Sequence, residues 1–177
     1  SDAFGSCFDV CPLEYSGHGT RICDPLLTNY TQCVNDICMQ IRRFCTNNYI
    51  ILGHSLGAAV ALGVANKMEN DYYNKPKHLI LMAETPPCSE VLAKKYKNKN
   101  KVEVMETVAE RGHVPHEIFE NQELYDIFSD IIYSDIRVLN GYSDFSFSKL
   151  EVPITVFSGS KDDFSDSDID QWKHYTN

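Results

Sequence analysis

Three short runs of the chain are mostly apolar, and the first of them is a continuous run of β-prone residues. They lie at residues 49–52, 78–82 and 154–157. Runs of this length and composition are typical of strands that a parallel sheet buries on both faces. A further short strand is expected at residues 8–13.

Two other segments repeat their small or apolar residues with the period of a helix. In residues 28–44 the apolar positions follow the i, i+3, i+4, i+7 pattern of an amphipathic helix, with Val34, Ile37, Cys38 and Ile41. Residues 56–69 predict a second helix, whose many Gly and Ala residues would let it lie close against a sheet. Strands that alternate with helices indicate an α/β fold, with a parallel sheet flanked by helices.

The segment of residues 84–150 interrupts this alternation. It begins with a Pro-Pro pair, continues through a stretch rich in Lys and Asn, and then shows helical patterns at residues 102–111 and 122–139. Helices inserted between two strands of one sheet are typical of a lid over the edge of that sheet. We therefore expect a single α/β-hydrolase-type domain over residues 1–177, with a lid insertion at about residues 84–150.

Length, composition and charge narrow the class of protein. A chain of 177 residues, 43% of them hydrophobic, can bury a core of its own. The formal net charge of −9 argues against a nucleic-acid binder, which concentrates Lys and Arg. No apolar run approaches the roughly 20 residues of a membrane span, so no membrane partner is expected.

The seven cysteines are odd in number and lack the close pairs of a zinc site. We therefore expect reduced, structural thiols in a cytoplasmic protein. Cys33, Cys38 and Cys45 are expected to act as small hydrophobic residues of a helix.

The sequence Gly53-His54-Ser55-Leu56-Gly57 lies between a predicted strand and a predicted helix. It matches the G-x-S-x-G pattern of a nucleophile elbow, in which a sharp turn lifts the serine hydroxyl clear of the sheet. Ser55 is therefore the candidate nucleophile, and the backbone N–H of Leu56 is a candidate oxyanion donor. An ordinary Gly-flanked turn is the simpler alternative.

A carboxylate is expected after a later strand, because α/β-hydrolases place their triad in the chain order Ser, then Asp or Glu, then His. The predicted strand at residues 154–157 is followed by Ser158-Gly159-Ser160-Lys161-Asp162-Asp163. Asp162 is the candidate acid and Asp163 is the reserve. The alternative is a solvated acidic loop, since further aspartates follow at positions 166, 168 and 170.

The triad histidine is harder to place. Six histidines are present, and only His174 follows Asp162. It falls on a predicted helix that begins near Asp168, so we expect a surface residue rather than the base. No strand with a Gly-rich oxyanion loop precedes Phe8 either. We therefore expect these residues to lack the first strand and the C-terminal segment that carries the histidine, beyond Asn177.

Further segments occur in order along the chain: Glu14 to Arg21 (EYSGHGTR), the elbow, Ala83 to Pro87 (AETPP), Tyr133-Ser134-Asp135 with Tyr142 downstream, and Pro153 through Asp162 to Trp172. Together they resemble the type II thioesterases that accompany non-ribosomal peptide and polyketide synthases. The resemblance covers nearly the whole chain, from about Phe8 to its end. Many hydrolases share the elbow motif, whereas the Gly-His-Gly-Thr turn, the Pro-Pro pair and the Asp-to-Trp spacing are more discriminating.

The resemblance implies a serine thioesterase, with Ser55 as nucleophile and Asp162 as triad acid. Its substrates would be acyl groups on the phosphopantetheine arm of acyl or peptidyl carrier proteins, from which it removes wrong or stalled groups in non-ribosomal peptide, polyketide or fatty acid synthesis. It calls for no metal or redox cofactor, and we expect a monomer. Two positions depart from the family: Ser16 replaces a Pro, and Tyr133 replaces an Arg, which changes the polarity of the lid.

Two other classes of function remain open on the sequence. One is an esterase of the same fold that acts on free small esters. The other is a non-catalytic, carrier-binding homologue, if no histidine completes the site.

A cluster of lysines stands out in this acidic chain, at positions 94, 95, 97, 99 and 101. One interpretation is a solvated loop, because like charges repel. The other is a surface that steers the phosphate of a carrier protein toward Ser55.

Overall fold

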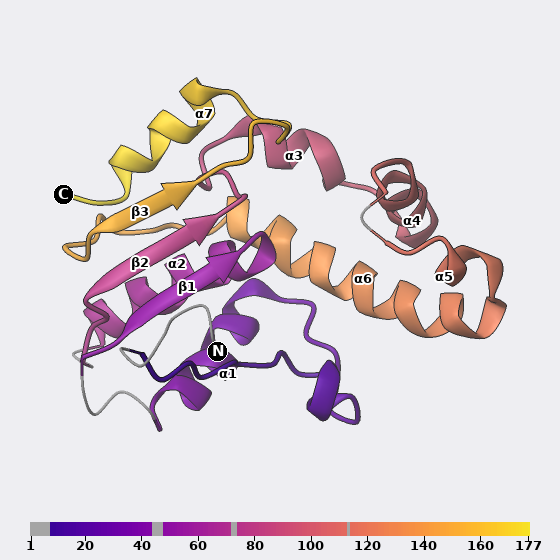
Figure 1. The fold of residues 1–177 in the computed structure, drawn as a ribbon, viewed down its shortest axis with the longest axis horizontal. Helices are drawn as coiled ribbons and strands as arrows, with labels where there is room; N and C mark the ends of the chain where they lie inside the picture. The colour runs from indigo at the N-terminus through magenta and orange to yellow at the C-terminus, as the bar shows by residue number, and fades with distance from the viewer. Residues whose placement is uncertain (1–7, 44–47, 72–73, 113) are drawn as a thin grey trace.

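The computed structural model describes residues 8–43, 48–71, 74–112 and 114–177. The strands in these residues are β1 (Ile50–His54), β2 (His78–Met82) and β3 (Ile154–Phe157). They form one parallel sheet in the order β1-β2-β3. All three arrowheads point toward the helices inserted between β2 and β3 (Figure 1). The predicted parallel sheet flanked by helices is confirmed.

The two faces of the sheet differ in their exposure. Leu79 and Leu81 point to one face and are completely buried. Leu52 and Phe157 point to the opposite face, where they are 48% and 55% exposed. The prediction that the strands are buried on both faces is therefore wrong for β1 and β3 in the described residues. Composition alone does not distinguish a strand covered on both sides from one covered on a single side.

The strand expected at residues 8–13 does not form. These residues have no regular secondary structure, and Phe8 and Val10 are 53% and 50% exposed. A strand is stable only when a neighbouring strand accepts and donates its backbone hydrogen bonds. The short apolar run has no such neighbour in the sheet.

Helix α2 (Leu56–Asn70) packs on β1 and β2, and α1 (Tyr30–Ile41) packs on α2. The two helices approach closely at Gly63, where an added Cβ would lie 2.4 Å from the Tyr30 hydroxyl oxygen. That hydroxyl donates a buried hydrogen bond to the carbonyl of Ala59, at 2.6 Å. The small residues predicted to allow close packing of α2 therefore do so. Cys33 and Cys38 are buried in α1 among its apolar residues, as expected, whereas Cys45 lies outside the described residues.

Between β2 and β3 the chain forms α3 (Glu90–Tyr96), α4 (Lys101–Glu110), α5 (Glu117–Glu120) and α6 (Gln122–Ser143). These four helices are called the lid below. Asn100 begins α4 with a capping box, and Asn121 caps the first turn of α6. None of the described helices is both long and apolar enough to cross a membrane.

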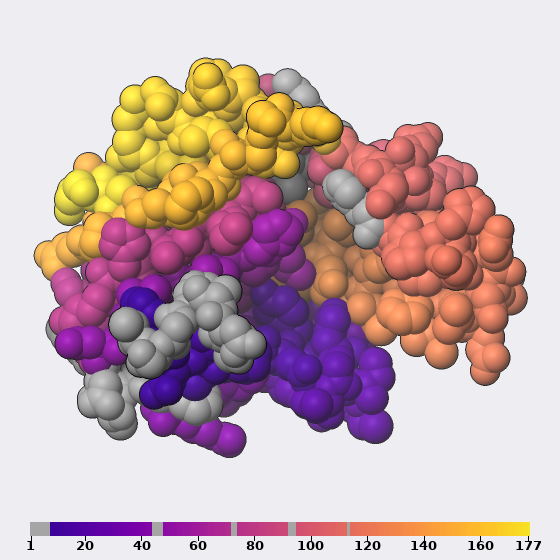
Figure 2. Space-filling view, in the orientation of Figure 1, coloured from indigo at the N-terminus to yellow at the C-terminus, as the bar shows by residue number. Residues whose placement is uncertain are grey.

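Helix α6 belongs to both the lid and the body of the protein. Its second half packs against α1 and α2, and Val138 and Tyr142 are buried there. Its first half packs against α4 and α5, away from the sheet (Figure 1). The space-filling view shows these helices as a lobe beside the sheet, with a hollow where the two meet (Figure 2).

After β3 the chain forms α7 (Asp166–Asp170) and the 3-10 helix η3 (Gln171–His174). Trp172 is buried and its indole N–H donates to the carbonyl of Glu84, at 3.2 Å. This bond ties the C-terminal helices to the end of β2. His174 is exposed on η3, as predicted from its position in a terminal helix.

Candidate active site

Ser55 occupies a sharp turn between β1 and α2. Its backbone angles, φ 50° and ψ −121°, are strained for a residue with a side chain. The Ser55 N–H donates to the carbonyl of Met82 at the end of β2, at 2.8 Å, and the side chain is exposed. The turn therefore has the geometry of a nucleophile elbow, as the sequence predicted.

The first glycine of the motif is a steric requirement. A Cβ on Gly53 would lie 2.2 Å from the carbonyl oxygen of Gly57, because the start of α2 folds back against the end of β1. A Cβ on Gly57 would have the Tyr15 hydroxyl, at 3.8 Å, as its nearest neighbour. The two glycines of G-x-S-x-G thus have unequal roles in this turn.

Leu56 is the first residue of α2. Its N–H belongs to the first turn of the helix, whose amide donors have no acceptor within the helix itself. The positive end of the helix dipole lies at the same place. This N–H is therefore suited to stabilise an oxygen anion formed at a carbon bonded to the Ser55 hydroxyl oxygen.

Ser55 faces a cavity of about 760 Å³ between the sheet edge and the lid. One part of the wall is apolar and comes from the lid helices, with Val91, Val108, Ile132, Ile136 and Leu139. Charged residues line the cavity too: Glu84, Lys95, Arg111, Asp135, Lys161, Asp162 and Asp163. A cavity of this size, with an apolar wall and a few polar groups, can hold a small acyl group.

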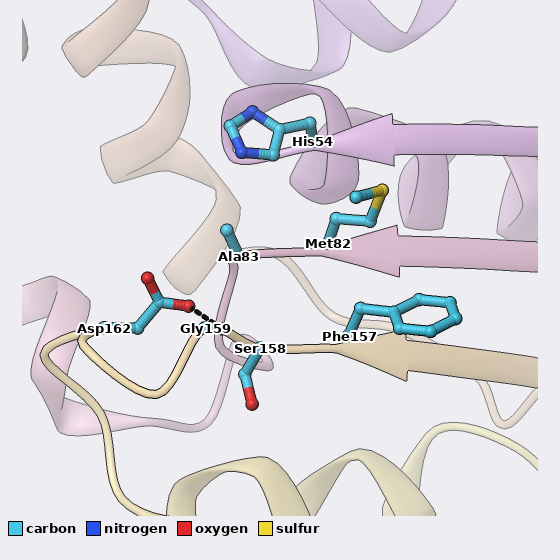
Figure 3. Close-up of a pocket in the computed structure, with 7 residues that line it drawn as sticks. All are labelled: His54, Met82, Ala83, Phe157, Ser158, Gly159 and Asp162. Carbon is cyan, nitrogen blue, oxygen red and sulfur yellow. Dashed lines mark hydrogen bonds between the residues drawn. The ribbon is translucent and has the colours of Figure 1, made fainter. Parts of the chain in front are cut away.

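A smaller hollow of about 340 Å³ adjoins it at the ends of the three strands. In the close-up, His54 ends β1, Ala83 follows β2, and Asp162 lies on the loop after β3 (Figure 3). Asp162 is half-buried and its carboxylate accepts the N–H of Gly159, at 2.6 Å. This bond fixes Asp162 at the carboxyl edge of the sheet.

The neighbouring Asp163 has different partners. Its carboxylate pairs with Arg111 of the lid, and the ammonium of Lys95 lies 3.9 Å from it. Asp163 lines the larger cavity only, whereas Asp162 lines both. These contacts favour Asp162 over Asp163 as the residue able to accept a hydrogen bond from an imidazole.

Glu84 also lines the larger cavity, and it was not among the functional residues predicted from the sequence. It is 7% exposed, and burial raises its pKa to about 7, although the Thr85 N–H and nearby Lys95 oppose the rise. The signal was present in the sequence: a carboxylate directly after the strand next to the elbow strand lies at the same edge as the nucleophile.

No described histidine hydrogen-bonds to Asp162. His54 is exposed at the elbow and lines both cavities. His18 is engaged elsewhere: its Nε2 lies 3.2 Å from Asp135 of α6 and its Nδ1 lies 3.1 Å from the carbonyl of Ser16. Both ring nitrogens of His18 therefore face oxygen acceptors. This histidine connects the turn before η2 (Gly19–Arg21) to α6 of the lid, and it does not serve as a free base.

Only part of the lysine cluster lies in a loop: Lys97 and Lys99 lie in the connection between α3 and α4, where Lys97 is exposed. Lys95 lies on α3 and Lys101 opens α4. Lys97 pairs with Asp144 at 3.1 Å, Lys101 pairs with Asp130 at 2.8 Å, and Lys99 donates to Thr107 at 2.6 Å. These contacts join the α3–α4 loop to α4 and to the end of α6, and the start of α4 to α6, so part of the lysine charge is compensated by neighbouring aspartates.

The chain matches a family model described as the thioesterase domain over residues 3–177. It is 22% identical to the linear gramicidin dehydrogenase LgrE of Brevibacillus parabrevis over 94% of this chain. It is 25% identical to the medium-chain S-acyl fatty acid synthase thioesterase of Homo sapiens over 95% of this chain. The chain spans slightly less than two thirds of these two relatives, 65% and 64% of their lengths.

Among solved structures, ClbQ from the colibactin non-ribosomal peptide and polyketide synthase pathway is 30% identical, with a TM-score of 0.77. The superposition covers 94% of this chain and 71% of ClbQ. By its match along nearly the whole sequence, the chain belongs to the thioesterase domain family.

Proposed function

We propose that this protein is a serine thioesterase that removes acyl groups from the phosphopantetheine arm of acyl or peptidyl carrier proteins. The observation that carries the proposal is the strained turn at Ser55, which presents an exposed hydroxyl to the cavity beneath the lid. Family membership supports it, and so does the occurrence of ClbQ in a non-ribosomal peptide and polyketide pathway. The release or editing of acyl chains during such syntheses, or during fatty acid synthesis, is the role that fits these relatives.

The chemistry begins with attack of the Ser55 hydroxyl oxygen on the thioester carbonyl carbon, while a histidine takes the hydroxyl proton. The Leu56 N–H stabilises the oxyanion, and Asp162 holds the second ring nitrogen of that histidine. The carbon–sulfur bond then breaks and the histidine returns its proton to the departing sulfur, which leaves readily because a thiol has a pKa near 8.5. Water, activated by the same histidine, hydrolyses the acyl-serine and regenerates Ser55.

The identity of the nucleophile matters because one relative is named a dehydrogenase. A hydrolase must use Ser55 covalently, whereas an oxidoreductase need not. Labelling with a fluorophosphonate probe distinguishes the two, since the probe reacts only with an activated serine. We expect labelling of the protein and its loss in Ser55→Ala, with hydrolysis of an acyl-carrier thioester falling at least about a thousandfold.

The controls separate a thioesterase from the other possibilities. Ser158→Ala removes a hydroxyl that lines the smaller hollow and should leave labelling intact. Faster hydrolysis of simple oxyesters than of acyl-carrier thioesters would indicate an esterase. Absence of labelling together with binding of an acyl-carrier protein would indicate a non-catalytic homologue.

A further inference from the structure

Glu84 is held rigidly at the edge of the sheet that carries the nucleophile. It follows β2 through Ala83, whose φ of 52° turns the chain sharply toward the cavity. Its carbonyl accepts the indole N–H of Trp172 at 3.2 Å, and the carbonyl of the next residue, Thr85, accepts the Tyr142 hydroxyl at 3.1 Å. Two buried aromatic residues therefore fix the backbone on which the Glu84 carboxyl stands.

The Glu84 carboxyl uses only one of its oxygens within the protein. Its Oε1 accepts the N–H of Thr85 at 2.9 Å, and also faces the Thr85 hydroxyl at 3.5 Å. Within the described part of the chain, no buried side-chain oxygen or nitrogen lacks a hydrogen-bond partner. The second oxygen, Oε2, has no protein partner there, so its remaining surface opens into the cavity that Glu84 shares with Ser55.

The charged groups nearest to Glu84 do not take that oxygen. The carboxyl interacts electrostatically with three titratable side chains, Lys95 and Tyr96 of α3 and Tyr142 of α6. Lys95 makes its closest ion pair with Asp163, at 3.9 Å. Tyr142 donates its hydroxyl proton to Thr85. Among the described residues, then, no ion pair neutralises Glu84.

Binding a hydrocarbon chain against this carboxyl costs free energy. Burying a polar oxygen against methylene groups without a hydrogen bond is unfavourable. An acyl group that carries a hydrogen-bond donor can donate to the Oε2 of Glu84. If that donor is an ammonium group, it also forms an ion pair with the ionised carboxylate. Sites built around a buried polar group reject analogues that lack the matching group.

We propose that Glu84 is a specificity-determining residue, which selects acyl chains carrying an amino group over hydrocarbon chains of the same length. This rests on the proposed function, because it assumes that the cavity holds the acyl group of a thioester. It assigns the cavity two parts: the lid side chains enclose the methylene groups, and Glu84 binds the amine.

The test measures binding separately from turnover. The Ser55→Ala protein is titrated with acyl-pantetheine analogues in which a methylene group replaces the sulfur. Three amino acyl groups, β-alanyl, γ-aminobutyryl and ε-aminocaproyl, are each compared with the hydrocarbon of equal length, butyryl, valeryl and heptanoyl. We expect at least one amino acyl group to bind at least about tenfold more tightly than its hydrocarbon partner.

Glu84→Gln should abolish that preference, and Glu84→Met should reverse it. Glu106→Gln, which removes the same charge from an exposed position on α4, should leave it unchanged. The preference should also increase as the pH rises from 6 to 8, since Glu84 ionises in this range. Equal binding within all three pairs, or a preference that survives Glu84→Gln, would overturn the proposal.

The same proteins with Ser55 restored separate this proposal from the proposed function. Hydrolysis of an acetyl thioester with no amine preference in binding would leave the thioesterase standing and remove the role of Glu84. An amine preference without any hydrolysis would do the opposite.

Discussion

The edge of the sheet and the lid above it are held in place by different interactions. At the edge, the backbone positions Ser55: the turn is fixed by a hydrogen bond to Met82 and by the close contact of Gly53 with Gly57. In the lid, side chains position the helices, through buried apolar residues such as Val104 and Met105 and through surface ion pairs such as Lys101 with Asp130. Backbone contacts tolerate almost no substitution, whereas surface ion pairs contribute little individually. The difference indicates that the nucleophile is built rigidly, and that the shape of the cavity is the part open to variation.

The largest expected effect tests whether the edge holds a catalytic acid. Asp162→Asn should lower kcat/KM for an acyl thioester by about a thousandfold or more, because a neutral amide neither fixes the histidine tautomer nor stabilises the imidazolium. Asp163→Asn should lower it by less than about tenfold, because it breaks an exposed ion pair with Arg111. The opposite order would assign the acid to Asp163. Steady-state kinetics of the two variants provide the comparison.

The second test compares the two glycines of the elbow. Gly53→Ala should destabilise the protein by about 3 kcal/mol or more, since its methyl group would meet the backbone of Gly57 and must displace α2. Gly57→Ala is the matched control and should change the free energy of unfolding by no more than about 1 kcal/mol. Urea denaturation of both variants measures this. Similar losses in the two would show that the close contact at Gly53 does not hold the elbow.

The third test uses Glu84, which is buried at the edge of the sheet. The pKa of Glu84 is higher in the folded protein, about 7, than the ordinary value of 4.5. Its contribution to stability is therefore fully present below about pH 4.5 and is lost as the pH rises through 7. Glu84→Gln should stabilise the protein by as much as about 3 kcal/mol at pH 8, and much less at pH 5. If the difference between the urea midpoints of Glu84→Gln and the unmodified protein did not vary with pH, the raised pKa of a buried Glu84 carboxyl would be contradicted.

The smallest effect concerns the lid. Lys97→Gln and Lys101→Gln should each lower stability by about 0.5 kcal/mol, and by less in high salt, because each removes one exposed ion pair. Since their charges are compensated within the lid, we expect no change in KM for an acyl-carrier protein. A KM that rises at low salt, with no change for a small thioester, would instead support a docking surface for the carrier.

Much of the edge could be predicted from local sequence. The bounds of β2 and β3 follow directly from their apolar runs, and α2 begins at Leu56 as its pattern predicts. The elbow was predictable because its motif spans only five residues, although the structure adds a hydrogen bond from Ser55 to the distant Met82. The absent strand at residues 8–13 shows the limit: an apolar run predicts a strand only if another strand is available to pair with it.

The lid was predictable only in outline. Helices α4 and α6 were expected from their periodicity, whereas α3 and α5 were not, and α6 extends past the expected end at residue 139 to Ser143. The ion pairs of the lysine cluster could not be predicted, because the partners Asp130 and Asp144 lie far along the chain. Glu84 looked like an ordinary strand-end residue for the same reason, because Trp172 and Tyr142 reach it from distant segments.

The sequence by itself determined the alternation of strands and helices, the turn at Ser55 and the candidate acid at Asp162. Each of these depends on side-chain periodicity or on backbone conformation over a few residues, which the local sequence controls. Only the tertiary structure decided which face of the sheet is covered, which aspartate is occupied by Arg111, and that the Glu84 carboxyl is buried beside the nucleophile. Burial and charge pairing depend on what distant segments bring to a residue, and no short stretch of sequence contains that information.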